Sequence, residues 1–226
     1  MNTTELKSEF NLYFNNLASN MAPGLDDVEI SIYLTKGQEV LEDALYGEFE
    51  KSEEARRKLA PVVDTAKLSV VTVPSNKILY PEYTTTYAPI DNIRYIINEQ
   101  VKMASNANTC IKGKHLKVQP ISHDEIDDVV ENPYKFNIRR ALRLDTANNN
   151  TPYIEILTKD KHIDYYQIRY VKTPEPIMLY TSSQYTDTIN GYAPLTTPRE
   201  ATLPDITHRQ IVEIAAKLAY NDYKNS

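Results

Sequence analysis

The sequence predicts an α+β fold, in which N- and C-terminal helices pack as one helical core with an inserted β-rich lobe and extended arms. Near both ends apolar residues recur at helical spacing, whereas the middle consists of short β-branched and aromatic runs separated by turn residues. We therefore expect an N-terminal helical hairpin over residues 1–62, a β-rich lobe with one short helix over 63–180, an extended arm over 181–203, and over 204–226 a C-terminal helix that packs on the N-terminal helices.

The stretch 24–49 is the longest periodic segment, and the sequence predicts one helix along it. Asp26 and Glu29 have the spacing of a capping box, in which each side chain accepts a hydrogen bond from the other residue's backbone amide. Gly37 lies on the apolar stripe, where either another backbone comes close or the helix tolerates a weak residue. The stripe predicts one contiguous core made with the terminal helices, formed by Leu6, Phe10, Phe14, Leu17, Ile30, Leu34, Leu41, Leu45 and Leu218.

Three further helical segments follow from the same spacing. Residues 4–19 form a first amphipathic helix, and 51–59 either prolong the second helix or form a short third one after a kink near Gly47. The last helix begins with a second capping box, made by Thr207 and Gln210.

The middle lobe is expected to contain at least five strands, at 67–73, 92–103, 114–121, 152–158 and 163–172, with 177–180 as a candidate sixth. The pair 152–158 and 163–172 is interpreted as a hairpin. Its short helix is expected to be capped by Ser122, with Glu125 at the capping-box position.

The segment Thr181–Leu203 has neither helical nor strand periodicity, and 80–89 is a smaller stretch of the same kind. Structureless segments this long are either functional or disordered. The alternatives are an arm that lies on another surface, with Tyr185 and Tyr192 as anchors, and a linker.

Composition excludes several classes of function. A net charge of -6 and a pI near 5.3 argue against a surface that binds duplex nucleic acid, although an acidic lining along which DNA slides stays open. Only Cys110 is present, so an intramolecular disulfide and a cysteine-based zinc site are excluded. No apolar run is long enough to span a bilayer. The 17 tyrosines suit protein interfaces, or else fill half-buried strands.

No pattern in the sequence points to catalysis, a metal or a cofactor. The run HDEIDD at His123 is interpreted as an acidic first helical turn, because a calcium loop needs a glycine and a ligand spacing that are absent. Asp205, Glu213 and Lys217 resemble a nuclease set only superficially, since an i, i+4 Glu–Lys pair on a helix explains the last two. The sequence also lacks a Walker loop, a dinucleotide fingerprint, a nucleophile elbow and HExxH.

Two blocks resemble the neck (head-to-tail connector) ring proteins of crAss-like tailed phages. The first is FNLYFNNLASNMAPGLDDVEISIYLTKGQEVL, with matching residues Gly24, Leu25, Glu29, Leu34, Thr35, Lys36, Gln38 and Glu39. The second is LPDITHRQIVEIAAKLAYND, with matching residues His208, Ile211, Val212, Glu213 and Ala215. Together they cover less than a third of the chain, and Gly37 stands where the family pattern has Ala.

The resemblance implies a structural virion protein. Its copies would form a closed, dodecameric ring in the neck, between the portal protein and other neck or tail rings, through which genomic DNA passes without sequence-specific binding. It implies no membrane, and a location in the virion after assembly in the host cytoplasm. Residues expected at subunit or portal interfaces are Thr35, Lys36, Gln38, Glu39, Tyr185, Tyr192, His208 and Glu213.

Two other classes stay open. A tail-side ring, such as a tail terminator or a tail-associated structural protein, would share this composition and meet other partners. A phage-encoded, non-enzymatic binding module would instead be monomeric or dimeric and carry a basic face, and the acidic balance counts against it. For the polar residues of the second helix, a solvated face is the alternative to an interface.

Overall fold

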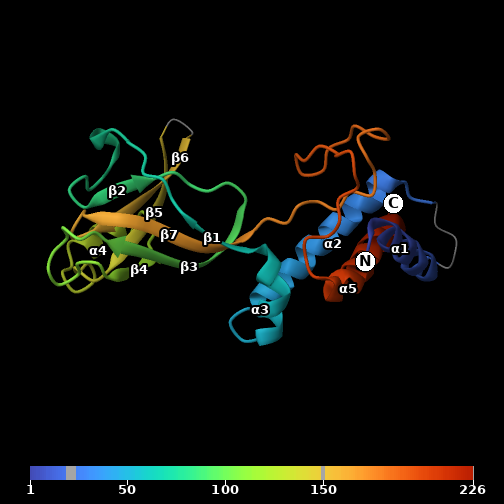
Figure 1. Ribbon diagram of the computed structural model, residues 1–226, viewed down its shortest axis with the longest axis horizontal. Coiled ribbons are helices and arrows are strands. Elements are labelled where there is room, and N and C mark those ends of the chain that lie inside the picture. Colours follow the sequence, from blue (N-terminus) through green and yellow to red (C-terminus); the bar gives the residue numbers. More distant parts are fainter. Residues whose placement is uncertain (19–23, 149–150, 226) are drawn as a thin grey trace. The chain divides into compact units, whose positions relative to one another are not determined.

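The computed structural model describes residues 1–18, 24–148 and 151–225. The chain divides into two compact units (Figure 1). The helical unit comprises Met1–Val63 and Thr173–Ser226, and the β unit comprises Asp64–Lys172. Both ends of the chain thus belong to the helical unit, and the β unit is inserted between them.

The helical unit contains α1 (Thr3–Leu17), α2 (Asp27–Gly47), α3 (Glu53–Leu59), the short 3₁₀ turn η1 (Ala60–Val62) and α5 (Asp205–Asn225). The capping box of α2 is confirmed: the Glu29 amide donates to Asp26 over 2.7 Å, and the Asp26 amide donates to Glu29 over 3.0 Å. Helix α2 ends at Gly47, and α3 is a separate helix capped by Ser52. The alternative of a short third helix is therefore the observed one.

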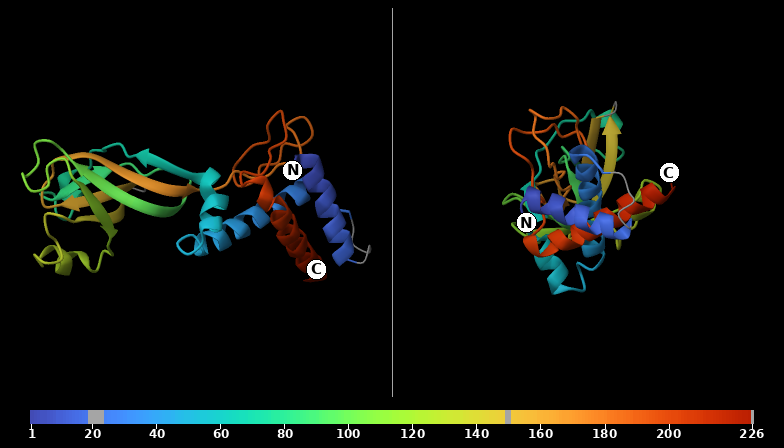
Figure 2. Two further views of the ribbon diagram at one scale, coloured as in Figure 1. Left: turned by 60° about the horizontal axis from the view of Figure 1, so that its bottom comes forward. Right: turned by 90° about the vertical axis from the view of Figure 1, so that its right-hand side faces the viewer.

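Helix α5 packs against both α1 and α2, so it forms the main contact of each N-terminal helix. Figure 2 shows α1 and α5 running side by side in both views. Most of the predicted stripe is buried here, including Phe10, Ile30 and Leu34. Two predicted core residues differ: Leu17 is 37% exposed, and Leu218 is only half-buried. The buried residues of α5 are Thr207, His208, Ile211, Val212, Ala215, Ala216 and Ala219.

The close backbone approach expected at Gly37 is confirmed. A Cβ atom built there would lie 2.8 Å from the carbonyl oxygen of Ile211 and 3.1 Å from the Cβ of Ala215, both in α5. Because Gly37 has no side chain, α2 and α5 approach one another at backbone distance. The predicted second capping box is wrong, since α5 begins at Asp205 and the Thr207 hydroxyl donates to the Pro204 carbonyl within the first turn.

The β unit is built from seven strands: β1 (Val63–Lys67), β2 (Thr84–Tyr87), β3 (Ile93–Met103), β4 (His115–Pro120), β5 (Ala141–Asn148), β6 (Thr151–Thr158) and β7 (Ile163–Lys172). They form one sheet in the order β1-β7-β3-β4-β5-β6-β2. All pairs for which a register is established are antiparallel except β4 with β5, which are parallel. The sheet is strongly curled (Figure 1).

The two edges of the sheet meet just beyond β1. Val70 forms a bridge with Tyr87 of β2. Two backbone hydrogen bonds of 2.9 Å flank it: the Val71 amide donates to the Thr86 carbonyl, and the Ala88 amide donates to the Ser69 carbonyl. The sheet therefore closes into a barrel, which leaves its edge strands paired. Inward-facing side chains fill the barrel, including Tyr87, Val101, Met103, Leu116, Val118, Ile156, Tyr166 and Ile168.

A polar network also lies in the barrel interior. Arg143 of β5 donates to Glu99 of β3 over 2.5 Å, and the Tyr166 hydroxyl of β7 donates to the other Glu99 oxygen over 2.7 Å. The network links three strands. It also pairs and hydrogen-bonds the buried Glu99 carboxylate, without which burying that charge would be unfavourable.

Several predictions for the β-rich lobe are wrong. Segments 152–158 and 163–172 are strands, but they do not form a hairpin: β6 pairs with β2 and β5, and β7 pairs with β3. Strands β2 and β5 are not predicted, and the strand expected at 67–73 shares only Lys67 with β1. Residues 177–180 belong to the helical unit, where Met178 forms one bridge with Arg199.

The expected short helix is α4 (Ile126–Val130), but Ser122 does not cap it: Glu125 occupies the N-cap position without a side-chain hydrogen bond. This helix covers an outer side of the barrel. There, Ile126 and Val130 pack with Phe136, Leu142, Leu144 and Leu157. The barrel thus has an apolar interior and a second, smaller apolar cluster outside it.

Candidate functional site

A stripe of buried polar residues on α2 holds the segment that leads into the long loop 181–203. We call Ser31, Thr35 and Gln38 the polar seam; they lie on one helix face at i, i+4 and i+7. The Leu179 amide donates to the Ser31 hydroxyl over 2.9 Å, and the Ile177 amide donates to the Thr35 hydroxyl over 3.1 Å.

Gln38 completes the seam by binding the segment before the loop and the end of the loop. Its side-chain amide donates to the Glu175 carbonyl, and its side-chain oxygen accepts from the Thr202 amide, each over 3.0 Å. The segment before the loop and the end of the loop are thereby hydrogen-bonded to one helix, although the loop itself has no regular structure.

Of the polar residues expected to lie on an exposed face of α2, Thr35 and Gln38 are buried. The expectation of exposure is wrong for these two, because their hydrogen-bonding groups serve the backbone of the returning chain instead of solvent. Lys36 is exposed, and its Nζ lies 5.5 Å from the centre of the Tyr33 ring. Glu39 is half-buried and accepts a hydrogen bond from Asn190 of the loop over 2.8 Å.

The loop 181–203 turns back on itself within the helical unit. Met178 and Arg199 exchange two backbone hydrogen bonds of 2.9 Å, and the Ser182 amide donates to the Leu195 carbonyl. Ile189 packs with Met178 and Tyr180 against the half-buried Val28 and Ile32 of α2. In this structure of a single chain, the segment is a folded loop on its own α2; whether it also reaches a neighbouring copy stays a prediction.

Both tyrosines proposed as anchors lie on this loop. Tyr185 is 38% exposed, and its ring packs edge-on against the buried Tyr180, with the ring centres 5.5 Å apart. Tyr192 is half-buried, and the Arg199 guanidinium lies 5.1 Å from its ring centre. Tyr185 and the half-exposed Leu195 therefore offer apolar surface from the loop, whereas Tyr192 mainly supports its base.

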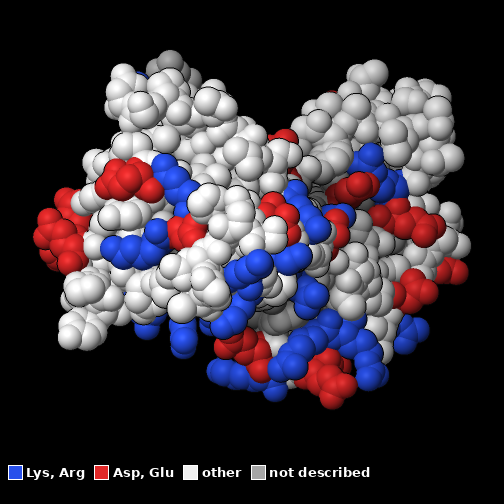
Figure 3. Space-filling model, turned by 60° about the vertical axis from the view of Figure 1, so that its left-hand side comes forward, with Lys and Arg blue, Asp and Glu red and all other residues white. Residues whose placement is uncertain are grey.

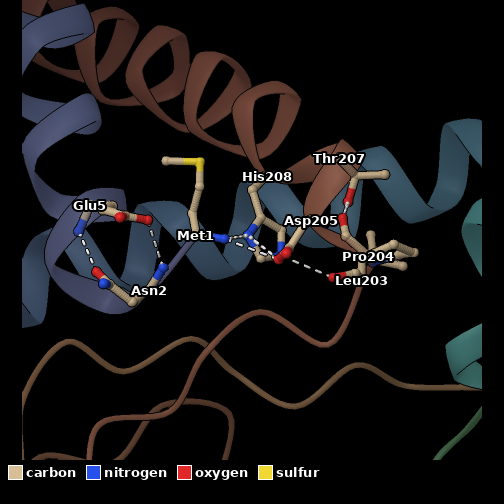
Figure 4. A network of polar contacts seen from close by, with 8 residues as sticks. All are labelled: Met1, Asn2, Glu5, Leu203, Pro204, Asp205, Thr207 and His208. Atoms are coloured by element: carbon tan, nitrogen blue, oxygen red, sulfur yellow. Dashed lines mark hydrogen bonds and ion pairs between the residues drawn. The ribbon is translucent and has the colours of Figure 1, made fainter.

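His208 is buried at the start of α5 (Figure 4). Its Nε2 lies 3.0 Å from the Leu203 carbonyl, and its Nδ1 lies 3.1 Å from the Met1 amino group. Because a carbonyl only accepts and an ammonium only donates, these contacts fit the tautomer with its proton on Nε2. A hydrogen bond from the Met1 amine lowers the pKa of the neighbouring Asp205 carboxyl. His208 therefore joins the starts of α1 and α5.

Glu213 is exposed on α5 and pairs with Lys217 over 2.7 Å, the i, i+4 pair that the sequence predicts. Of the predicted site residues, Thr35, Gln38 and Glu39 lie on α2, and Tyr185 and Tyr192 lie on the loop that packs on it. His208 and Glu213 lie on α5 and are separate from this group. No described group of three or more His, Cys, Asp or Glu residues could hold a metal ion.

Sequence reasoning missed Ser31, although its spacing from Thr35 and Gln38 is a readable signal. It also missed the outer face of α1, where Leu12 and Tyr13 line a groove with Glu9, Asn16 and Arg209. None of the helices in the described ranges is both long and apolar enough to cross a membrane.

The whole chain matches known proteins of one kind. A family model described as "Phage tail ring protein 3/4" matches residues 1–226. A protein of Bacteroides phage crAss001 called "Ring protein 4/5" is 30% identical over 99% of this chain and 94% of its own length. A second protein of that phage, "Ring protein 3", is 28% identical over 97% of this chain and 95% of its own length.

Proposed function

This chain belongs to the phage tail ring protein 3/4 family, and on that premise we propose that it is a structural subunit of an oligomeric ring in the phage virion. The match over residues 1–226 carries the proposal, because it includes the helical unit, the β unit and the loop, and not a single motif. The nearly full-length similarity to two ring proteins of one phage also supports it.

The ring is proposed to lie in the neck, between portal and tail, and to continue the conduit for DNA during packaging and ejection. Copies in a closed ring meet head to tail, so each subunit presents one surface and receives a different one. The proposed presenting surface is the loop 181–203 with Tyr185, together with Lys36 and Glu39 of α2. Its hydrogen bonds to the polar seam support this role, since a loop that is already held in place loses less entropy on binding.

A position on the tail side is the second candidate. The family description names a tail ring, and the chain is similar to two proteins with different ring numbers at nearly equal identity. In either position the proposed role is structural, without catalysis or a cofactor.

Native mass spectrometry and electron micrographs of the purified full chain test this function. We expect closed rings of about a dozen 25.9-kDa subunits, alone or on addition of the portal or the other ring proteins of the same phage. A chain that stays monomeric with all these partners would overturn the proposal. A reconstruction of the virion then decides between the neck and tail-side positions.

A further inference from the structure

The outer surface of four neighbouring barrel strands carries a group of basic side chains. Side chains of paired residues on adjacent strands point to the same side of a sheet. The register pairs Lys102 of β3 with Tyr165 of β7 and with His115 of β4, while Gln100 pairs with Gln167 and Lys117. These residues alternate with buried ones such as Val101 and Leu116, so they face outward. We call Lys67, Lys102, Lys117, Tyr165 and Arg169 the basic face.

Contacts between these side chains show that they form one surface. Tyr165 is its centre: the Lys67 Nζ lies 4.0 Å and the Lys102 Nζ 5.4 Å from its ring centre. The Gln100 amide donates to Gln167 over 2.8 Å, and Arg169 contacts the Thr65 hydroxyl of β1 over 3.4 Å. Lys67, Lys117 and Arg169 are exposed, and Asp164 at the end of the face pairs with Lys102 over 3.2 Å. Figure 3 shows Lys and Arg side chains spread over the face that it presents, with Asp and Glu among them.

The charges of the two units have opposite sign. The β unit holds 15 Lys and Arg against 13 Asp and Glu, a net charge of +2, and the helical unit holds 10 against 18, a net charge of -8. Residues 43–54, the acidic segment, contain five Asp and Glu residues, all of them exposed, and only Lys51 as a basic residue. Two of them are paired within α3, Glu53 with Arg57 and Glu54 with Lys58. The segment covers the end of α2 and the start of α3, and Glu48 and Glu50 in the intervening turn are exposed.

We propose that the basic face binds the acidic segment of a second copy of this chain. The inference rests on the proposed function, because only a head-to-tail ring lets every copy present its basic face to one neighbour and its acidic segment to the other. Opposite charges favour contact between the basic face of one copy and the acidic segment of the next, and they disfavour contact between two basic faces or two acidic segments. Tyr165 and the amides of Gln100 and Gln167 supply the uncharged contacts between the lysines.

Charge favours a second copy over DNA as the partner of this face. A duplex carries a dense charge that a protein neutralises with many Lys and Arg. Here Lys102 is already paired with Asp164, and the whole chain has a net charge of -6, which multiplies around a ring and repels a duplex.

A charge-swap series on the full chain tests the inference. Lys67→Glu/Lys117→Glu reverses the basic face, and Glu48→Lys/Glu50→Lys reverses the acidic segment. Lys77→Glu is the matched control, since Lys77 is exposed in the β unit beside β6, where the Tyr153 hydroxyl donates to its carbonyl. Circular dichroism and thermal melting confirm that each variant is folded. The readout is the protein concentration at which rings form, by sedimentation and micrographs at low and high salt.

Each double reversal is expected to raise the concentration at which rings form by at least about tenfold, because it places like charges opposite one another. Lys77→Glu should leave that concentration unchanged. All four reversals together should return it to the value of the parent chain. Rings that form equally well from Lys67→Glu/Lys117→Glu would overturn this inference and leave the proposed function standing. The absence of any self-association of the parent chain, even with its neck partners, would overturn both. Loss of binding to a labelled duplex, with unchanged ring formation, would identify the basic face as a DNA surface and also overturn the inference.

Discussion

Gly37 of α2 and Ile211 of α5 meet at backbone distance: a Cβ atom at position 37 would lie 2.8 Å from the Ile211 carbonyl oxygen. This contact sets how closely the two long helices of the helical unit approach. Glycine is a weak helix former, so the close contact with α5 explains why a residue without a side chain lies in the middle of α2.

Gly37→Ala is therefore expected to destabilise the protein, by about 1–3 kcal/mol, because the added methyl group pushes against backbone and not against a flexible side chain. Gly47→Ala is the matched control. It lies in the same helix, and a Cβ atom added there would meet no atom within 4 Å, so it should stabilise by up to about 1 kcal/mol. Urea denaturation measures both, and the same sign for the two variants would contradict the close approach.

Leu34→Ala is expected to cost on the order of 2–5 kcal/mol, because Leu34 is fully buried in the helical core and its truncation leaves a cavity. Leu17→Ala should cost much less, since Leu17 belongs to the same predicted stripe but is 37% exposed. Thermal melting of the two variants makes the comparison. If both substitutions left the melting temperature unchanged, the stripe would be a binding face and not a core.

The helical unit was largely predictable because its signals are local. The capping box of Asp26 and Glu29 and the apolar spacing along α2 lie within one segment, and the structure contains both. Strand pairing is not local: β6 and β7 are joined by a short connection, yet each pairs with other strands. Alternation of residues identifies a strand but not its partner, so the sequence predicts a hairpin where the structure has a closed barrel.

The candidate site was only partly predictable for a different reason. Thr35 and Gln38 are polar, and sequence reasoning assigned them to solvent or to a neighbouring subunit. Their partners are backbone groups of residues far along the chain, such as Ile177 and Thr202. A polar residue on a helix satisfies its hydrogen bonds equally well with water, a neighbouring subunit or a returning loop. The residue type alone does not show which of these partners it has.

Glu155 predicts a pH dependence of stability. It is buried in β6, and burial raises the pKa of its carboxyl above the ordinary value of 4.5. The folded state then holds the proton more tightly than the unfolded state does. Its stabilising effect is present below the ordinary pKa and is lost as the pH rises through the folded-state value.

Glu155→Gln removes this charge and keeps the shape of the side chain. We expect a higher melting temperature than the parent near neutral pH, and a difference that shrinks toward pH 4.5. Glu125→Gln, at an exposed position beside α4, should change little at either pH. A constant difference across this pH range would show that the Glu155 carboxyl is not responsible.

Lys36→Glu is expected to impair ring assembly without unfolding the chain. Lys36 is exposed and its known neighbour is the Tyr33 ring, so charge reversal leaves the polar seam intact. Lys224→Glu makes the same charge change at an exposed position in the last turn of α5 and serves as the control. Native mass spectrometry counts subunits in each, and normal rings from Lys36→Glu would place this surface in solvent.

The loop 181–203 leads to the last prediction, because its order depends on Gln38. Ordering each residue costs roughly 1–2 kcal/mol, and the loop buries few apolar side chains of its own. The two hydrogen bonds of Gln38 hold Glu175, which precedes the loop, and Thr202, near its end, against α2. Gln38→Ala should therefore speed proteolytic cleavage within 181–203 in the free chain, whereas Gln210→Ala, exposed on α5, should not.

Assembly should reverse this sensitivity if the loop binds the next subunit. We expect protease to cut the free chain first within 181–203 and to spare that segment in assembled particles, since Tyr185 and Leu195 would then be covered. Mass spectrometry of the fragments locates the cuts in both states. Equal cleavage rates in free and assembled protein, or full assembly after deletion of residues 183–200, would mean that the loop only connects Tyr180 to α5 and contributes nothing to the ring.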